Sequence, residues 1–321
     1  MRKTPKVVSL FSGAGGMDLG LEKAGLEIVW ANDNDKDSLD TYKANLKTNT
    51  IILSDILDVR SENIPDPDLI VGGFPCQGFS VANKFRSIND SRNILYLEML
   101  RIVNDKQPKW FVAENVRGIL NIENGKVIEK IVDDFANAGY SVKYQLINMA
   151  NYGVPQMRKR VIILGTRKDL MPNFELCYPN ETHSENGDMN TKKWVSVNEA
   201  FINLEKFGEL ADKDVGTKYK LEIRNFTGHR ATDGSKPSPT ILARGNGKGG
   251  VNATPHPNGI RRMTVRESAW IQTFPHNFKF YGSVNSKYRQ IGNAVPVKYS
   301  KLLGAKVIEV YNKYLRSIDS V

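Results

Sequence analysis

The sequence predicts an α/β protein with a second, smaller region that is rich in loops. Strand and helix patterns alternate over the first 170 residues, as they do in a sheet that is covered by helices. No sustained periodicity is found over residues 172–260, and Gly and Pro are frequent over residues 227–259. Hydrophobic residues make up 40% of the 321-residue chain, which is enough for a substantial core.

The expected strands are short apolar runs, and the expected helices have apolar residues three or four positions apart. The strands lie at residues 7–10, 28–31, 51–53, 69–71, 110–113, 144–147 and 161–164. The helices lie at residues 16–24, 38–46, 93–103, 127–138 and 297–315, and Gly25 is expected to end the first of them. Because the two patterns alternate, we expect helices on both faces of the sheet. In the loop-rich region, residues 240–242 are expected to form a short strand.

The net charge of +10 comes mainly from the second half of the chain. Residues 1–170 hold 23 basic and 21 acidic residues, whereas residues 171–321 hold 22 and 14. Residues 215–270 alone hold 10 basic and 3 acidic residues. A regional surplus of this kind favours a polyanionic partner, although a merely solvated basic surface would have the same composition.

Several classes of protein are excluded or disfavoured. The chain has two cysteines, Cys76 and Cys177, so a disulfide scaffold is excluded and a reducing, cytoplasmic compartment is expected. No apolar run approaches the roughly 18 residues that a membrane-spanning helix needs. The first residues lack the pattern of a signal peptide. The four histidines are scattered, and none has a zinc-like spacing with a cysteine pair, so we expect no metal site.

A glycine-rich turn at residues 11–16 (FSGAGG) follows the first strand and opens the first helix. Glycines let a ligand approach the backbone, and a helix N-terminus offers free N–H groups. Asp18 stands where the dinucleotide-binding fingerprint has its third glycine, which weakens a dehydrogenase interpretation. Asp33 and Asp55 follow the next two strands, where carboxylates can accept from ribose hydroxyls and from an adenine amino group. Together these features suggest an adenosine ligand, and turn or cap residues are the simpler alternative for the two acids.

The loop after the fourth strand carries the second candidate feature. Cys76 lies between glycines and directly after Pro75, at the sheet edge where sites form. Such a position exposes the sulfur, and a thiol whose pKa is lowered by its surroundings can act as a nucleophile. Cys177 has no comparable context and is expected to be a packing residue.

These features occur in an order that resembles the bacterial DNA (cytosine-5) methyltransferases of the restriction–modification type. The resemblance covers nearly the whole chain and includes the glycine turn, the two acids and the loop Pro75-Cys76-Gln77. Further matching motifs are residues 114–116 (ENV), 156–160 (QMRKR), 261–267 (RRMTVRE), 272–275 (QTFP) and 290–296 (QIGNAVP). Each motif alone is moderately specific, and the complete series in this order is very specific.

The resemblance implies a Rossmann-like, S-adenosylmethionine-dependent methyltransferase sheet with a smaller, loop-rich target-recognition domain. The catalytic and cofactor-binding domain would span residues 1–177 and be completed by residues 285–321, and residues 178–284 would form the target-recognition domain. The cofactor site would draw on residues from both ends of the chain. They are Phe11, Gly13, Gly15, Asp33, Asn34, Asp55, Ile56, Pro75, Leu95, Asn293 and Ala294. Asn34 departs from the family, in which a larger apolar side chain often packs on the adenine.

The resemblance also implies a mechanism. Cys76 would add to carbon 6 of a cytosine flipped out of the duplex, which makes carbon 5 nucleophilic. Glu114 would share a proton with N3 of the ring, and Arg160 would hold O2. Arg158 would orient these groups. No side chain stands out as the base that removes the proton from carbon 5.

Double-stranded DNA is the implied partner of a monomeric bacterial protein that associates with the nucleoid, and a cognate restriction endonuclease would act separately. The expected DNA contacts are polar and basic residues in two regions. They are Gln77, Ser80, Lys84 and Arg86 after the catalytic cysteine, and Arg224, Arg230, Lys236, Arg244 and Lys248 in the recognition domain.

Two other functions stay open. A transfer-RNA cytosine-5 methyltransferase would use the same chemistry, but the basic middle segment and the lack of a Cys-Phe-Thr motif weigh against it. A catalytically silent DNA-binding regulator would keep the fold, but the intact set of Cys76, Glu114 and Arg160 weighs against it. A nicotinamide dehydrogenase is the weakest alternative, because the sequence shows no acid–base set for that chemistry.

Overall fold

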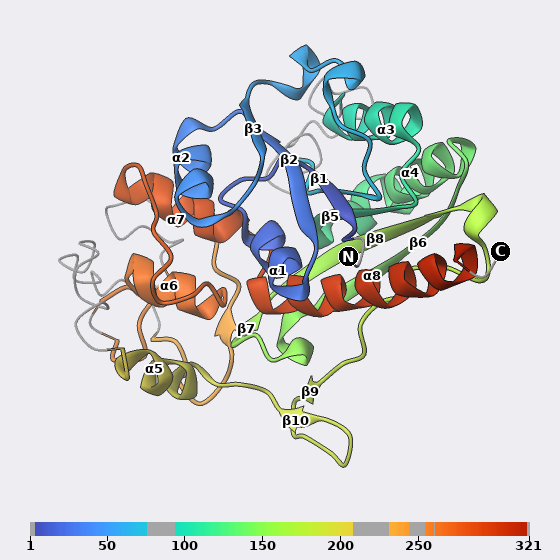
Figure 1. Cartoon of the computed structure of the whole chain (residues 1–321). Coiled ribbons are helices and arrows are strands. Elements are labelled where there is room, and N and C mark those ends of the chain that lie inside the picture. Colours follow the sequence, from blue (N-terminus) through green and yellow to red (C-terminus); the bar gives the residue numbers. More distant parts are fainter. Residues whose placement is uncertain (1–3, 76–93, 208–230, 244–253, 260, 320–321) are drawn as a thin grey trace.

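A seven-stranded sheet lies at the centre of the protein, and helices cover both of its faces (Figure 1). The computed structural model describes residues 4–75, 94–207, 231–243, 254–259 and 261–319. The strand order is β3-β2-β1-β4-β5-β8-β6. The bounds are β1 Lys6–Leu10, β2 Glu27–Asp33, β3 Thr50–Leu53, β4 Leu69–Gly72, β5 Trp110–Val116, β6 Tyr140–Asn148 and β8 Lys159–Arg167. The expected strands are confirmed, and each is longer than its apolar run.

The direction of the strands brings one set of loops together. β1 to β5 run parallel to one another, whereas β8 runs antiparallel between β5 and β6. The carboxyl ends of the parallel strands therefore meet at one edge of the sheet, where α/β proteins place their ligands. Because β8 is reversed, its first residues lie at that same edge.

Helices pack on both faces of the sheet, as the sequence predicts. Their bounds are α1 Gly16–Ala24, α2 Lys36–Asn45, α3 Ile94–Lys106, α4 Lys126–Asn137 and α8 Val297–Ile318, each within three residues of the expected end points. Successive side chains of a strand point to opposite faces. Val8 and Leu10 of β1 pack with α3 and α4, and Val7 packs with α1 and α8. Burial of these two apolar clusters is the main source of stability.

The last helix, α8, packs along the first helix, α1 (red and dark blue in Figure 1). Small residues allow this close approach. A Cβ atom added at Gly16 would lie 2.7 Å from the carbonyl oxygen of Val295, and one at Gly20 would lie 2.6 Å from that of Val297. The residues that precede α8 are thereby placed beside the glycine-rich turn.

Three helices were not expected from the sequence: α5 Val197–Glu205, α6 Val265–Ile271 and α7 Val284–Asn293. α5 has a helical pattern after all, because Val197, Ala200, Phe201 and Leu204 form its buried face. The pattern is only nine residues long and lies in a region without other periodicity. These helices share an apolar cluster with α2.

The prediction of a strand at residues 240–242 is wrong, because side chains form hydrogen bonds with the backbone groups that would pair with another strand. The N–H of Ile241 donates to Oε1 of Gln156 at 2.9 Å, and its carbonyl accepts from Arg158 at 3.3 Å. Short two-residue strands occur nearby instead. They are β7 Gln156–Met157 paired with β11 Ser238–Pro239, and β9 His183–Ser184 paired with β10 Lys192–Lys193.

The contact between α1 and α8 predicts a large cost for a side chain at Gly20. Gly20→Val forces a branched side chain against α8, and we expect it to lower the free energy of unfolding by about 1–3 kcal/mol. Lys23→Val places the same side chain on an exposed position of α1, where only about 0.5 kcal/mol of helix propensity is lost. Urea unfolding of both variants measures the difference, and equal losses would contradict the packing argument.

Candidate active site

A cleft of about 1660 Å³ opens at the carboxyl edge of the parallel strands. Its wall is built from the residues that follow these strands, from the start of β8 and from the end of α7. They include residues 11–14, 33–35, 54–56, 72–75, 114–118, 159–160 and 292–295. Segments from the whole length of the chain therefore meet in one site.

The glycine-rich turn is held against the end of β2. The N–H of Ser12 donates to the carbonyl oxygen of Asn32 at 2.9 Å, and the N–H of Gly13 donates to Oδ2 of Asp33 at 2.8 Å. Gly13 has a φ of 54°, which glycine adopts without steric cost. A Cβ atom there would meet no atom within 4 Å, so the backbone of the turn faces open space.

The two acids expected at the strand ends have different local roles. Asp33 accepts N–H groups at both oxygens, from Gly13 and, at 2.9 Å, from Asp35. Burial raises the pKa of Asp33, and these backbone donors oppose the shift. Asp55 caps the short helix Ile56–Asp58 by accepting from the N–H of Leu57 at 3.1 Å. The cap interpretation therefore holds for Asp55, but the N-cap of α2 is Asp35, not Asp33.

Asp18 lies under the glycine-rich turn and is 1% exposed. Its carboxylate accepts from the hydroxyl of Ser9 at 2.9 Å and from that of Tyr42 at 2.7 Å. Burial raises its pKa to about 6, and the two hydroxyl donors oppose this rise. The residue that departs from the dinucleotide fingerprint is therefore a buried link between β1, α1 and α2.

A buried ion pair joins β5 and β8 at the edge of the cleft. Nε of Arg160 lies 2.8 Å from Oε1 of Glu114, and both side chains are nearly buried. The strand register explains the contact, because Glu114 pairs with Ile162, and Arg160 pairs with Val116 two positions further. Both side chains line the cleft, so a carboxyl group and a guanidinium are available side by side to a ligand in the cleft.

Asn115 connects this pair to the loop that follows β4. Its Nδ2 donates to the carbonyl oxygen of Phe74 at 3.1 Å, inside the protein. Its Oδ1 accepts from the N–H of Val116 at 2.8 Å, which fixes the rotamer of the amide. The backbone that leads to Pro75, the last described residue of this loop, is therefore anchored beside Glu114.

A network of buried amide and guanidinium groups lies behind the cleft. Nε2 of Gln156 donates to Oε1 of Gln272 at 2.9 Å, and Gln272 donates to the carbonyl oxygen of Ile291 at 2.7 Å. Arg158 donates to the carbonyl oxygen of Gly292 at 2.9 Å. The segment from β7 to the start of β8 is thereby held against the end of α7.

The structure brings together most of the predicted site residues that it describes. Those at the wall of the cleft are Phe11, Gly13, Asp33, Asn34, Asp55, Ile56, Pro75, Leu95, Glu114, Arg160, Asn293 and Ala294. Gly15 and Arg158 do not line it. Gly15 has a φ of 81° and faces the side chains of Leu46 and Tyr42, and the guanidinium of Arg158 is fully buried in the network behind the cleft.

The other predicted site residues lie outside the described part of the chain. They are the proposed nucleophile Cys76 and the DNA-contact candidates Gln77, Ser80, Lys84, Arg86, Arg224, Arg230, Arg244 and Lys248. Lys236 is described, and it lies on an exposed surface 3.7 Å from Asp233.

Sequence reasoning missed three cations at the cleft: Arg117, Lys159 and Arg289. Arg117 and Lys159 are exposed, and their side chains have no ion-pair partner among the described residues. Arg117 directly follows a motif that the sequence analysis identified, and this proximity was the available signal. Arg289 comes to the cleft from α7, and its partner lies 254 residues away.

Comparisons with known proteins give one consistent result. Residues 5–309 match the family model described as C-5 cytosine-specific DNA methylase. The type II methyltransferase M.NgoFVII of Neisseria gonorrhoeae is 37% identical, with 98% of this chain and 89% of that protein covered. M.FnuDI of Fusobacterium nucleatum is also 37% identical, with 95% and 94% covered. A solved Escherichia coli prophage protein, described as a DNA modification methyltransferase, is similar in fold, with a TM-score of 0.70 at 23% identity over 96% of this chain and 100% of that one.

The buried carboxyl group of Asp18 predicts a pH-dependent effect of its substitution. Because its pKa is raised from 3.8 to about 6 in the folded chain, its ionisation lowers stability as the pH rises through this window. Asp18→Asn cannot ionise. We therefore expect the loss of stability that it causes to be about 1 kcal/mol larger at pH 5 than at pH 7.5. Leu21→Ala removes a buried apolar side chain from the same helix, and urea unfolding should show the same loss of stability at both pH values. An equal loss at both pH values for Asp18→Asn would contradict the prediction.

Proposed function

This chain belongs to the C-5 cytosine-specific DNA methylase family and is an S-adenosylmethionine-dependent DNA (cytosine-5) methyltransferase, and from this premise we propose how its cleft performs the reaction. The observation that carries the proposal is the Glu114–Arg160 pair, which lines the same cleft as the turn after β2, residues 33–35. One part of the cleft would hold the cofactor and the other would hold a flipped cytosine.

The described residues fit the adenosine half of the cofactor. The carboxylate of Asp33 is fixed at both oxygens by backbone N–H groups, and each oxygen keeps a lone pair for a ribose hydroxyl. The open space at Gly13 lets a ligand approach the backbone of the turn. Phe11, Asp55 and Ile56 stand at the same wall and would border the adenine. The bound cofactor supplies an electrophilic methyl group.

The catalytic steps are assigned to three side chains. The Cys76 thiolate would form a bond to carbon 6 of the cytosine, and the electrons displaced from the ring double bond would make carbon 5 nucleophilic. Glu114 would hold or share a proton at N3, and Arg160 would donate to O2, so that the charge developing on the ring is stabilised. After methylation, water would take the proton from carbon 5, and the carbon–sulfur bond would break to release Cys76.

The geometry supports this division of labour. Nε of Arg160 is paired with Oε1 of Glu114 at 2.8 Å, and one Nη group donates to the carbonyl oxygen of Lys159 at 2.9 Å. The other Nη group has no partner among the described residues and is available to O2 of the cytosine. The hydrogen bond from Asn115 to Phe74 would keep the cysteine loop beside Glu114. Arg158 is assigned a positioning role only, because its guanidinium is buried away from the cleft.

The basic second half of the chain is assigned to DNA recognition. Residues 178–284 are proposed as the target-recognition domain, and residues 1–177 with 285–321 as the catalytic domain. The surplus of 10 basic over 3 acidic residues at 215–270 supports this assignment, since phosphate contacts supply most of the affinity for DNA. We further propose that the protein acts as a monomer in the bacterial cytoplasm. The type II methyltransferase names of its relatives support the proposal that it protects DNA from a separate endonuclease.

A labelling assay tests the reaction and the nucleophile. Tritiated S-adenosylmethionine is incubated with duplex DNA or with transfer RNA, and we expect label in duplex DNA only, with none for Cys76→Ala. Glu114→Gln should lower kcat by about 10²–10⁴-fold, because proton sharing at N3 is lost. DNA that contains 5-fluorocytosine should trap a covalent complex with the wild-type protein, because the fluorine cannot leave carbon 5. Label only in RNA, or equal label from Cys76→Ala, would refute the proposal.

The two exposed cations at the cleft predict a further effect on DNA binding. Arg117 and Lys159 stand beside the Glu114–Arg160 pair, where the phosphates that flank a flipped cytosine would lie. We expect Arg117→Gln and Lys159→Gln each to weaken DNA binding about threefold to tenfold and to reduce the salt dependence by about one phosphate contact.

Lys301→Gln is the matched control for these two variants, because Lys301 is an exposed lysine that does not line the cleft. Fluorescence anisotropy at several salt concentrations measures all three. Unchanged salt slopes for Arg117→Gln and Lys159→Gln would exclude the phosphate contacts.

A further inference from the structure

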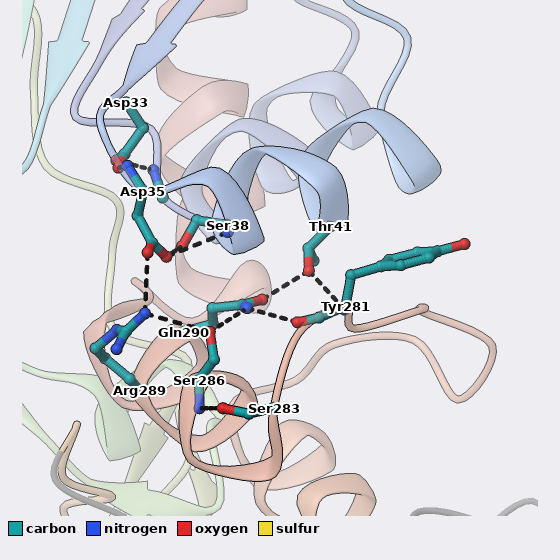
Figure 2. Close-up of polar contacts among 10 residues, drawn as sticks. Asp33, Asp35, Ser38, Thr41, Tyr281, Ser283, Ser286, Arg289 and Gln290 are labelled. Atoms are coloured by element: carbon teal, nitrogen blue, oxygen red, sulfur yellow. Dashed lines mark hydrogen bonds and ion pairs between the residues drawn. The ribbon is translucent and has the colours of Figure 1, made fainter. Parts of the chain in front are cut away.

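An ion pair ties α7 to the turn that follows β2 (Figure 2). Arg289 on α7 donates from Nη2 to Oδ1 of Asp35 at 2.9 Å. The other oxygen of Asp35 caps α2 by accepting from the N–H of Ser38 at 3.2 Å and from its hydroxyl at 2.5 Å. Asp35 is therefore held from two sides, once by its own helix and once by α7.

Asp35 in turn fixes the carboxylate of Asp33. The N–H of Asp35 donates to Oδ1 of Asp33 at 2.9 Å, and the N–H of Gly13 holds Oδ2 at 2.8 Å. The orientation of this carboxylate thus depends on the glycine-rich turn at one oxygen and on Asp35 at the other. A shift of Asp35 would rotate the group that the proposed function assigns to the ribose hydroxyls.

A second set of contacts holds α7 on α2 independently of Arg289. Oε1 of the buried Gln290 accepts from the hydroxyl of Thr41 at 2.7 Å, and its Nε2 donates to the carbonyl oxygen of Tyr281 at 2.9 Å. The N–H of Tyr281 donates to the same Thr41 oxygen at 2.8 Å. Figure 2 shows these contacts of Gln290, Thr41 and Tyr281 beside the ion pair. Loss of the Arg289 side chain should therefore leave α7 in place.

The position of the ion pair points to ligand binding rather than to folding. The Arg289 side chain is 48% exposed and that of Asp35 is 33% exposed, and pairs of this exposure contribute little to stability. Both residues nevertheless line the cleft, together with Asp33 and Asn34. Asn34 would offer no large apolar surface to an adenine bound in this part of the cleft, so such a ligand would depend more on the polar groups of this turn.

We propose that Arg289 is a positioning residue for S-adenosylmethionine, which acts by holding Asp35 so that Asp33 faces the ribose hydroxyls. The inference rests on the cofactor site described under the proposed function. It differs from a contact role, because Arg289 acts through two other residues and does not itself need to touch the cofactor.

The test compares two ligands on two proteins by titration calorimetry. The ligands are S-adenosylhomocysteine and its 2′-deoxyribose analogue, and the proteins are the full wild-type chain and Arg289→Gln. We expect Arg289→Gln to bind S-adenosylhomocysteine about threefold to fivefold more weakly. The loss of affinity on removing the 2′-hydroxyl from the ligand should be smaller in this variant, because the carboxylate of Asp33 is no longer held facing that hydroxyl. Arg289→Lys should recover part of the affinity.

Kinetics and stability separate positioning from a general loss of structure. In Arg289→Gln, the KM for S-adenosylmethionine should rise while kcat at saturation stays close to that of the wild type. Unfolding in urea should be nearly unchanged. A purely structural role would instead lower stability and leave the 2′-hydroxyl penalty as it is in the wild type, which would overturn the inference.

Two controls complete the test. Lys36→Gln removes an exposed ion pair with Asp40 (2.6 Å) within α2, the helix that Asp35 caps, and should change neither affinity nor KM. Asp33→Asn combined with Arg289→Gln should bind no more weakly than Asp33→Asn alone. If the wild-type protein binds no S-adenosylhomocysteine, the proposed cofactor site fails. If it binds and Arg289→Gln binds equally well, only the role of Arg289 fails.

Discussion

The arrangement of the site depends on the hydrogen bonds of one buried guanidinium group, that of Arg158. Its side chain is fully buried and donates to the carbonyl oxygens of Gly292 and Ile241. Burial lowers the pKa of Arg158 far below its usual range, and the nearby carboxylate of Glu114 opposes this shift. A buried cation is tolerated only where hydrogen bonds replace its water. The carbonyls that accept from the two Nη groups of Arg158 belong to segments more than 80 residues away in the sequence, so the fold brings these segments together behind the cleft.

The reversed strand β8 has a direct consequence for the chemistry. In a sheet of parallel strands, the residues at the carboxyl edge are strand ends, so each strand contributes only its last positions. Because β8 runs the other way, its first residues stand beside the last residues of β5. This register places Arg160 diagonally opposite Glu114 and gives their 2.8 Å contact. The ion pair is therefore a result of strand direction, and it needs no loop to hold it.

The parts of the site that are local in sequence could be predicted, and the parts that depend on distant contacts could not. The turn at residues 11–16, Asp33 and Asp55 follow apolar runs directly, so strand periodicity alone locates them at one edge. The burial of Arg158 could not be read in this way, because an arginine in a basic turn and one inside the protein have the same local pattern. The pairing of Arg289 with Asp35 spans 254 positions and leaves no local trace. The error at residues 240–242 has the same origin, since side chains of Gln156 and Arg158 take the backbone groups of Ile241.

Helix α7 borders both parts of the cleft, the one proposed for the cofactor and the one proposed for the cytosine. Its last turn is held by Gln272 and Arg158 behind the cleft, and its residue Arg289 reaches the turn that would bind the ribose. The helix starts at residue 284, where the proposed target-recognition domain ends, and its neighbour α6 packs with α5 from that domain. Because α7 packs on α6 and contacts Asp35, this one helix joins the packing of the proposed target-recognition domain to the turn that carries Asp33.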